Sequence, residues 1–174
     1  MVTALVKFGQ PQQALQLWRE HCPGSGQTML ADGDFARLQV HDVFSPFDWQ
    51  VIGDSDVSLS LADADRGRRD VVLASSAPFP RKILSQLAVL GAGNYRLSWA
   101  ARTDAGAPSP RIAAAVSCRP DGRDWLPARY DAGSRRYISE FALDGQCQAY
   151  WVGFAILPGS ESLRLGRISL QRLP

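Results

Sequence analysis

From residue 29 to the C-terminus, short stretches of alternating apolar and polar residues are separated by clusters of Gly, Pro, Asp and Ser. Regularly spaced short strands without helices between them are typical of a β-sandwich or barrel. The pattern therefore predicts a mainly β fold with antiparallel strands. The expected strands cover residues 38–40, 48–52, 57–61, 70–74, 82–90, 95–102, 112–118, 138–143, 150–157 and 162–170.

The alternation within single strands indicates which side chains form the core. Tyr95, Leu97 and Trp99 share one face of their strand, whereas Arg96 and Arg102 share the other face. A period of two with large apolar residues on one side is typical of a half-buried strand. We therefore expect Trp99 in the core and both arginines on the outside.

The last two predicted strands add two further expectations. In residues 150–157, Val152 and Phe154 have the inward phase, so Trp151 is expected on the outer side of its sheet. In the final strand the alternation slips by one residue near Gly166, which predicts a β-bulge.

The N-terminal part has a different pattern. Apolar residues in 4–21 have a helical spacing that Gly9 and Pro11 interrupt, which predicts two short helices. Residues 23–26, with the sequence PGSG, are typical of a linker. We therefore divide the chain into a helical segment with its linker, 1–26, and a β-sandwich domain, 27–174.

Composition and motifs exclude several functions. A net charge of +2 with scattered arginines does not predict nucleic-acid binding. No apolar run approaches the roughly 20 residues that span a bilayer, so this segment is not expected to insert into a membrane. His21 is expected at a solvated helix end and His41 in a turn. Because no nucleophile elbow, phosphate loop or zinc-protease motif is present, we predict no catalytic residue, and an enzyme is the least favoured function.

Three cysteines remain: Cys22, Cys118 and Cys147. None belongs to a C-x-x-C pair and only two histidines accompany them, so no metal site is expected. Cys118 ends one predicted strand and Cys147 begins another. The pair is either a disulfide or two small buried side chains. A disulfide would favour an exported or periplasmic location.

Four sequence segments, in order along the chain, resemble a known family. Residues 30–35 (LADGDF) and then 46–49 (PFDW) resemble the opening of jelly-roll carbohydrate-binding modules with a galactose-binding-like fold. Residues 85–87 (SQL) and then 93–102 (GNYRLSWAAR) resemble their central strand pair, with its Gln, Gly turn and Tyr-x-Leu-Ser-aromatic pattern. The resemblance covers roughly residues 29–172. It implies an antiparallel jelly-roll β-sandwich that binds a polysaccharide or oligosaccharide without catalysis.

The chain departs from this family where many members hold a structural calcium ion. The family's Glu after the first Phe is Ala36 here, and Gly166-Arg167 replaces its Asp-Asp in the closing strand. Calcium needs several oxygen ligands, and a guanidinium repels it. We therefore expect neither calcium nor another cofactor.

The helical segment has a weaker resemblance. Gly9, Ala14 and Trp18 resemble the small and aromatic positions of a tetratricopeptide-repeat hairpin. A single repeat cannot bury its own apolar face. Either the helix docks on the sandwich, or the chain is the C-terminal part of a longer helical-repeat protein, which is the favoured alternative.

Aromatic rings stack on sugars while arginine and amide groups bond the hydroxyls. Aromatic residues in loops or on outward faces are therefore candidate ligand contacts, together with polar residues of outward phase. The ligand-binding candidates are Trp125, Trp151, Tyr130, Arg96, Arg102 and Gln86. The alternative function is a structural or protein-interaction β-sandwich that does not bind sugar.

Overall fold

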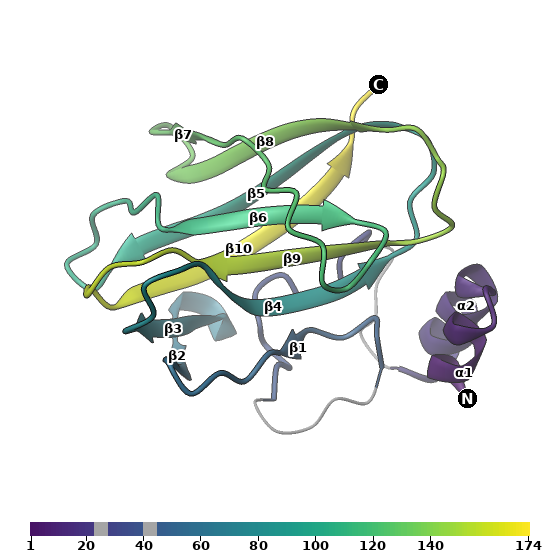
Figure 1. Ribbon diagram of the computed structural model, residues 1–174, viewed down its shortest axis with the longest axis horizontal. Coiled ribbons are helices and arrows are strands. Elements are labelled where there is room, and N and C mark those ends of the chain that lie inside the picture. The colour runs from purple at the N-terminus through teal and green to yellow at the C-terminus, as the bar shows by residue number, and fades with distance from the viewer. Residues whose placement is uncertain (23–27, 40–44) are drawn as a thin grey trace.

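Two antiparallel sheets pack face to face in the computed structural model, which describes residues 1–22, 28–39 and 45–174 (Figure 1). The four-stranded sheet has the order β1 (Gln50–Val51), β4 (Arg81–Ala88), β9 (Tyr150–Ile156), β6 (Ile112–Ser117). The six-stranded sheet has the order β2 (Val57–Asp63), β3 (Arg69–Ser75), β10 (Leu163–Arg172), β5 (Gly93–Thr103), β8 (Arg136–Leu143), β7 (Arg129–Asp131). The predicted mainly β, jelly-roll sandwich is confirmed.

Two details of the strand prediction differ from the structure. Strand β7 was not predicted, because three residues are too few to show an alternation. Residues 38 and 39 do not form a strand, and Val40 lies outside the described residues. Leu38 is nevertheless buried in the core, so its apolar character reflects packing and not pairing.

The core lies between the two sheets and contains the residues with the predicted inward phase. Trp99 on β5 is fully buried, and its ring contacts Phe154 on β9 edge to face at 5.6 Å. Tyr137 on β8, the register partner of Trp99, stacks on it with ring centroids 6.0 Å apart. Because Trp99 contacts both sheets, it joins them across the sandwich.

Two helices precede the sandwich, α1 (Val2–Lys7) and α2 (Pro11–His21). Gly9 between them has a φ of 74°, a conformation that glycine adopts without strain. Trp18 of α2 is buried against Phe47 with ring centroids 5.8 Å apart, and its indole N–H donates to Asp48. The helix thus docks on the sandwich, which is one of the two ways in which its apolar face was expected to be buried.

Several expectations about the N-terminal part have no support or no test in this structure. The described residues contain only these two short α-helices, besides a 3-10 turn at Asp65–Gly67, and they do not support the tetratricopeptide resemblance. The proposed boundary between residues 26 and 27 lies outside the described residues, so the division into two segments stays a prediction.

No helix within the described ranges is long and apolar enough to cross a membrane.

The predicted bulge is present in β10. Its register with β5 shifts between Gly166 and Ser169, and Arg167 in between has a φ of 53°. This left-handed conformation is uncommon for a residue with a β-carbon. The bulge changes the direction of Arg167 at the place where the outer face of the six-stranded sheet is hollowed.

Candidate functional site

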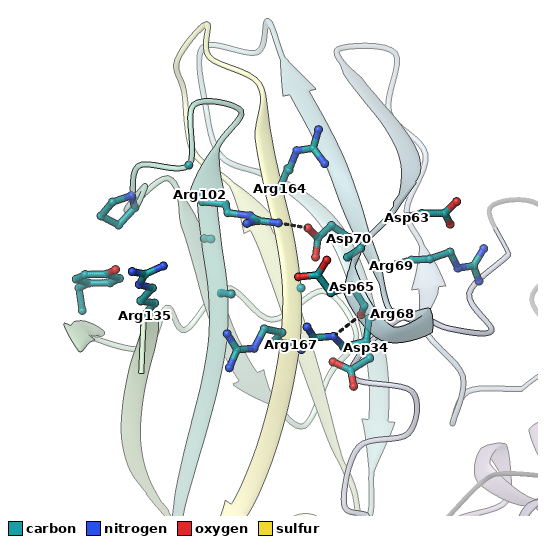
Figure 2. A pocket seen from close by; sticks show the side chains of 17 residues that line it. Asp34, Asp63, Asp65, Arg68, Arg69, Asp70, Arg102, Arg135, Arg164 and Arg167 are labelled. Atoms are coloured by element: carbon teal, nitrogen blue, oxygen red, sulfur yellow. Dashed lines mark hydrogen bonds and ion pairs between the residues drawn. The ribbon is translucent and has the colours of Figure 1, made fainter. Parts of the chain in front are cut away.

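One hollow lies on the outer face of the six-stranded sheet, and its cavity volume is about 480 Å³ (Figure 2). We call it the arginine trough, because six arginines line it: Arg68, Arg69, Arg102, Arg135, Arg164 and Arg167. Four aspartates also line it, namely Asp34, Asp63, Asp65 and Asp70. The lining therefore has mixed charge with an excess of two positive groups.

Small residues form the floor of the trough. Gly166 on β10 pairs with Ala100 on β5, and both residues line the cavity. A β-carbon at Gly166 would collide with the carboxylate of Asp70 on β3. Glycine is therefore required here so that the carboxylate of Asp70 can lie across the floor.

Arg102 crosses the trough and forms an ion pair with Asp70 at 2.6 Å (Figure 2). The side chain of Asp70 is only 10% exposed, so this pair is partly shielded from water. On the neighbouring strand, Arg164 pairs with Asp104 at 3.0 Å. These partners hold two arginines in place, so their charges are largely neutralised within the protein.

Tyr130 on β7 lies at one end of the trough and is 39% exposed. Its ring centroid lies 5.2 Å from that of Tyr137, its register partner on β8. Burial raises the pKa of Tyr137, and the neighbouring Tyr130 raises it further. Tyr130 thus adds a partly exposed aromatic ring, packed against Tyr137, at the β7 edge of the trough.

A second hollow of about 370 Å³ lies on the other side of the sandwich, and we call it the Trp125 groove. Its lining includes Trp125, Arg81, Lys82, Asp121 and Arg123. The chain after β6 folds back on that strand, where Trp125 forms a β-bridge with Ala115. The next residue, Leu126, donates its N–H to the carbonyl of Ala114. These backbone bonds position the indole of Trp125, which is 36% exposed.

Lys82 forms the opposite wall of this groove. Its side chain crosses Gly153, where an added β-carbon would lie 2.6 Å from Lys82 Cε. Its ammonium donates to the carbonyl of Pro120, within the loop that carries Trp125. Burial lowers the pKa of Lys82, whereas the charge of Asp121 raises it. Lys82 therefore connects β4 to that loop over the outer face of the four-stranded sheet.

The six candidates from the sequence do not converge on one surface. Arg102 and Tyr130 line the arginine trough, and Trp125 lines the groove on the opposite sheet. Arg96 faces outward from β5, where it pairs with Glu140 at 2.6 Å. Trp151 has the expected outward phase but is partly buried, because it packs against the apolar cluster around α2.

The expectation for Gln86 was wrong. Gln86 is 1% exposed, its amide oxygen accepts from the N–H of Ala31 at 2.8 Å, and its amide nitrogen donates to the carbonyl of Ala31 at 3.1 Å. Gln86 pairs with the core residue Val152 and therefore has the inward phase. Leu87 has the outward phase but is apolar, because it packs against the cluster around α2, and this reversed the expected faces of β4. Gln86 therefore binds the segment before β1 and not a ligand.

Cys118 and Cys147 form a disulfide in the structure, with their Cα atoms 5.8 Å apart. The bond connects the chain just after β6 to the chain just before β9. It thereby anchors the start of the loop that carries Trp125. Cys22 is free, and burial raises the pKa of its thiol, with a further contribution from Asp48.

The guanidinium of Arg69 lies beside Ala36, the position at which the resembling family has a Glu that binds calcium. Arg69 donates to the carbonyl oxygens of Phe35 at 2.9 Å, Ala36 at 2.7 Å and Leu38 at 2.9 Å. Within the described ranges, no three His, Cys, Asp or Glu side chains gather as a metal site. His41 lies outside those ranges, and the absence of calcium binding stays a prediction.

No family model matches the chain, and no curated protein matches it significantly. Solved structures share its fold. A proposed sugar binding protein from Bacteroides thetaiotaomicron is 11% identical, with a TM-score of 0.55 over 84% of this chain and 100% of that one. The carbohydrate-binding module TmCBM61, in complex with β-1,4-galactotriose, is 17% identical, with a TM-score of 0.54 over 85% of this chain and 100% of that one.

An enzyme also shares the fold. The enzymatically active domain of tailspike protein 4 from bacteriophage CBA120 is 8% identical and has a TM-score of 0.53. The match covers 84% of this chain but only 21% of the tailspike chain. At such identities the three likenesses show a common β-sandwich and nothing about the ligand.

Proposed function

We propose that this protein is a noncatalytic carbohydrate-binding module whose ligand lies in the Trp125 groove. The observation that carries the proposal is an indole held by backbone bonds, 36% exposed, in a groove with charged walls. A sugar ring can stack its apolar face on the indole. Lys82, Arg123 and Asp121 can donate to or accept from its hydroxyl groups.

The fold supports this assignment, because TmCBM61 is a carbohydrate-binding module with the same architecture. The groove also favours binding over hydrolysis. Glycoside hydrolysis uses two carboxyl groups that flank the scissile bond. Two aspartates line the groove, but Asp54 is paired with Arg81 at 3.2 Å. That leaves Asp121 as a single carboxylate toward the ligand, which suits hydrogen bonding.

The test is the affinity of the parent and of Trp125→Ala for galactan, xylan and mannan, measured by affinity electrophoresis. We expect the parent to bind at least one of them and Trp125→Ala to bind it roughly 5- to 150-fold more weakly, since stacking on an aromatic ring contributes about 1–3 kcal/mol. The matched control is Phe8→Ala, which removes an aromatic ring that is 82% exposed and does not line the groove.

Two results would count against the proposal. If Trp125→Ala and Phe8→Ala both bind as the parent does, the sugar site lies elsewhere on the protein. If the parent binds none of the glycans, a protein-interaction domain without sugar binding becomes the better interpretation.

A further inference from the structure

The proposed function does not use the arginine trough, although its charges are only partly neutralised. Arg102 and Arg164 have carboxylate partners, and Arg69 is bonded to backbone carbonyls. Arg135 and Arg167 differ, because neither side chain has a hydrogen bond or ion pair to any described residue. Figure 2 shows Arg167 extending from β10 toward the side of the trough on which Arg135 lies.

The backbone places these two arginines in uncommon conformations. Arg167 lies in the bulge of β10 with a φ of 53°, and Arg135 lies in the turn before β8 with a φ of 54°. For a residue with a β-carbon, this left-handed region is sterically unfavourable. Asn, Asp and Gly are the residues that favour it. Strained non-glycine residues gather at functional sites, and here both present a guanidinium to the same cavity.

A third arginine, Arg136, adds positive charge next to Arg167, although it does not itself line the trough. Arg136 donates to the carbonyl of Arg167 and to the hydroxyl of Ser169. Burial lowers the pKa of Arg136, and the charge of Arg167 lowers it further, while Asp34 acts in the opposite direction. The protein therefore holds like charges together here, and a bound anion would relieve their repulsion.

The opposite side of the trough carries aspartates among the side chains of Arg68 and Arg69 (Figure 2). The carboxylates of Asp63 and Asp65 line it without a hydrogen bond or ion pair to any described residue. Carboxylates accept hydrogen bonds from hydroxyl groups but repel a chain of phosphates. A ligand that fits both sides has an anionic group at one end and hydroxyl groups at the other. Tyr130 adds a partly exposed ring on β7, the strand that the turn with Arg135 connects to β8.

We propose that the arginine trough is a second binding site, which takes a carboxylate-bearing sugar such as a uronic acid within an oligosaccharide. The sugar carboxylate bonds Arg135 and Arg167, and its hydroxyl groups bond Asp63 and Asp65. A volume of about 480 Å³ lies in the range of small-molecule sites. The site is on the sheet opposite the Trp125 groove, so the two proposals stand independently.

The experiment is isothermal titration of the full chain with hexagalacturonate, hexamannuronate and a hyaluronan hexasaccharide, each beside its carboxyl-reduced counterpart. We expect at least one acidic oligosaccharide to bind, and its reduced form to bind at least about tenfold more weakly, because charge-assisted bonds are lost. Raising the salt concentration should weaken this binding through screening.

Glycine variants remove the guanidinium groups without opposing the backbone. Arg135→Gly and Arg167→Gly should each fold, since glycine adopts a positive φ freely, and each should bind the acidic sugar about tenfold more weakly. Arg66→Gly is the matched control: Arg66 is exposed, has a φ of 61° and does not line the trough. It removes the same charge from the same backbone conformation and should leave binding unchanged.

Each contrary outcome overturns the proposal. It fails if no acidic oligosaccharide binds, if Arg66→Gly weakens binding as much as the trough variants, or if both trough variants bind as the parent does. It also fails if inorganic sulfate displaces the sugar at equal concentration, because the trough would then bind an anion without recognising a sugar. Trp125→Ala should keep acidic-sugar binding, so a failure of the groove proposal remains distinguishable.

Discussion

Gln86→Leu tests whether the amide of Gln86 holds the segment before β1 on the sheet. The parent side chain donates one hydrogen bond to Ala31 and accepts another, at 3.1 and 2.8 Å, and both residues are buried. Leucine has a similar size but no polar atoms, so the N–H and the carbonyl of Ala31 both lose their partner. Each unsatisfied buried group costs about 1–3 kcal/mol.

The two lost bonds together cost about 2–6 kcal/mol, and the more apolar leucine offsets roughly 1–2 kcal/mol of this through burial. We therefore expect the free energy of unfolding to fall by about 3 kcal/mol. For a domain of this size, 1 kcal/mol shifts the melting temperature by about 2–4 °C, so the expected decrease is about 6–12 °C. Thermal unfolding followed by circular dichroism measures it, and urea unfolding gives the free energy.

The matched control is Gln171→Leu, an exposed glutamine on β10, which should change the free energy of unfolding by no more than about 0.5 kcal/mol. Below its melting temperature Gln86→Leu should bind glycans as the parent does, because Gln86 lines neither hollow. An unchanged melting temperature, or a selective loss of binding by a fully stable variant, would refute the structural role and restore Gln86 as a ligand contact.

Three further predictions concern stability. Trp99→Ala should lower the free energy of unfolding by about 3–5 kcal/mol in urea unfolding, as a large-to-small change in the core; a loss below 1 kcal/mol would contradict its position between the sheets. Cys118→Ser should cost about 3–4 kcal/mol, because the disulfide to Cys147 closes a loop with a sequence separation of 29, and only the third cysteine should react with a thiol reagent in the unreduced parent. Burial raises the pKa of Asp48 above its ordinary value of 3.8, so the folded protein holds this proton more tightly than the unfolded chain does. The contribution of Asp48 to the free energy of unfolding therefore falls as pH rises from 3.8 toward the raised pKa. Asp48→Asn keeps an acceptor for Trp18 and should lack this decrease, so unfolding between pH 3 and 6 that is parallel in both proteins would contradict it.

The alternation of apolar residues was sufficient to predict the sandwich. In β5 and β9 it identified Trp99 and Phe154 as core residues, and the slip near Gly166 located the bulge in β10. These features are local, because a pleated strand turns successive side chains to opposite faces whatever its neighbours are. The same reasoning correctly directed Trp151 outward, but it could not show that the apolar cluster around α2 would cover that ring.

Both candidate sites depended on the tertiary structure. Arg102 and Asp70 meet because β10 inserts between β3 and β5 in the six-stranded sheet, and this order is not visible from strands read one by one. Arg135 lies in a turn and Arg167 in a bulge, where periodicity carries no information about direction. The sequence by itself determined which face of most strands is buried, since that depends on a period of two. Only the packed sheets decided which outward residues share a surface, because that depends on strand order and on what covers each face.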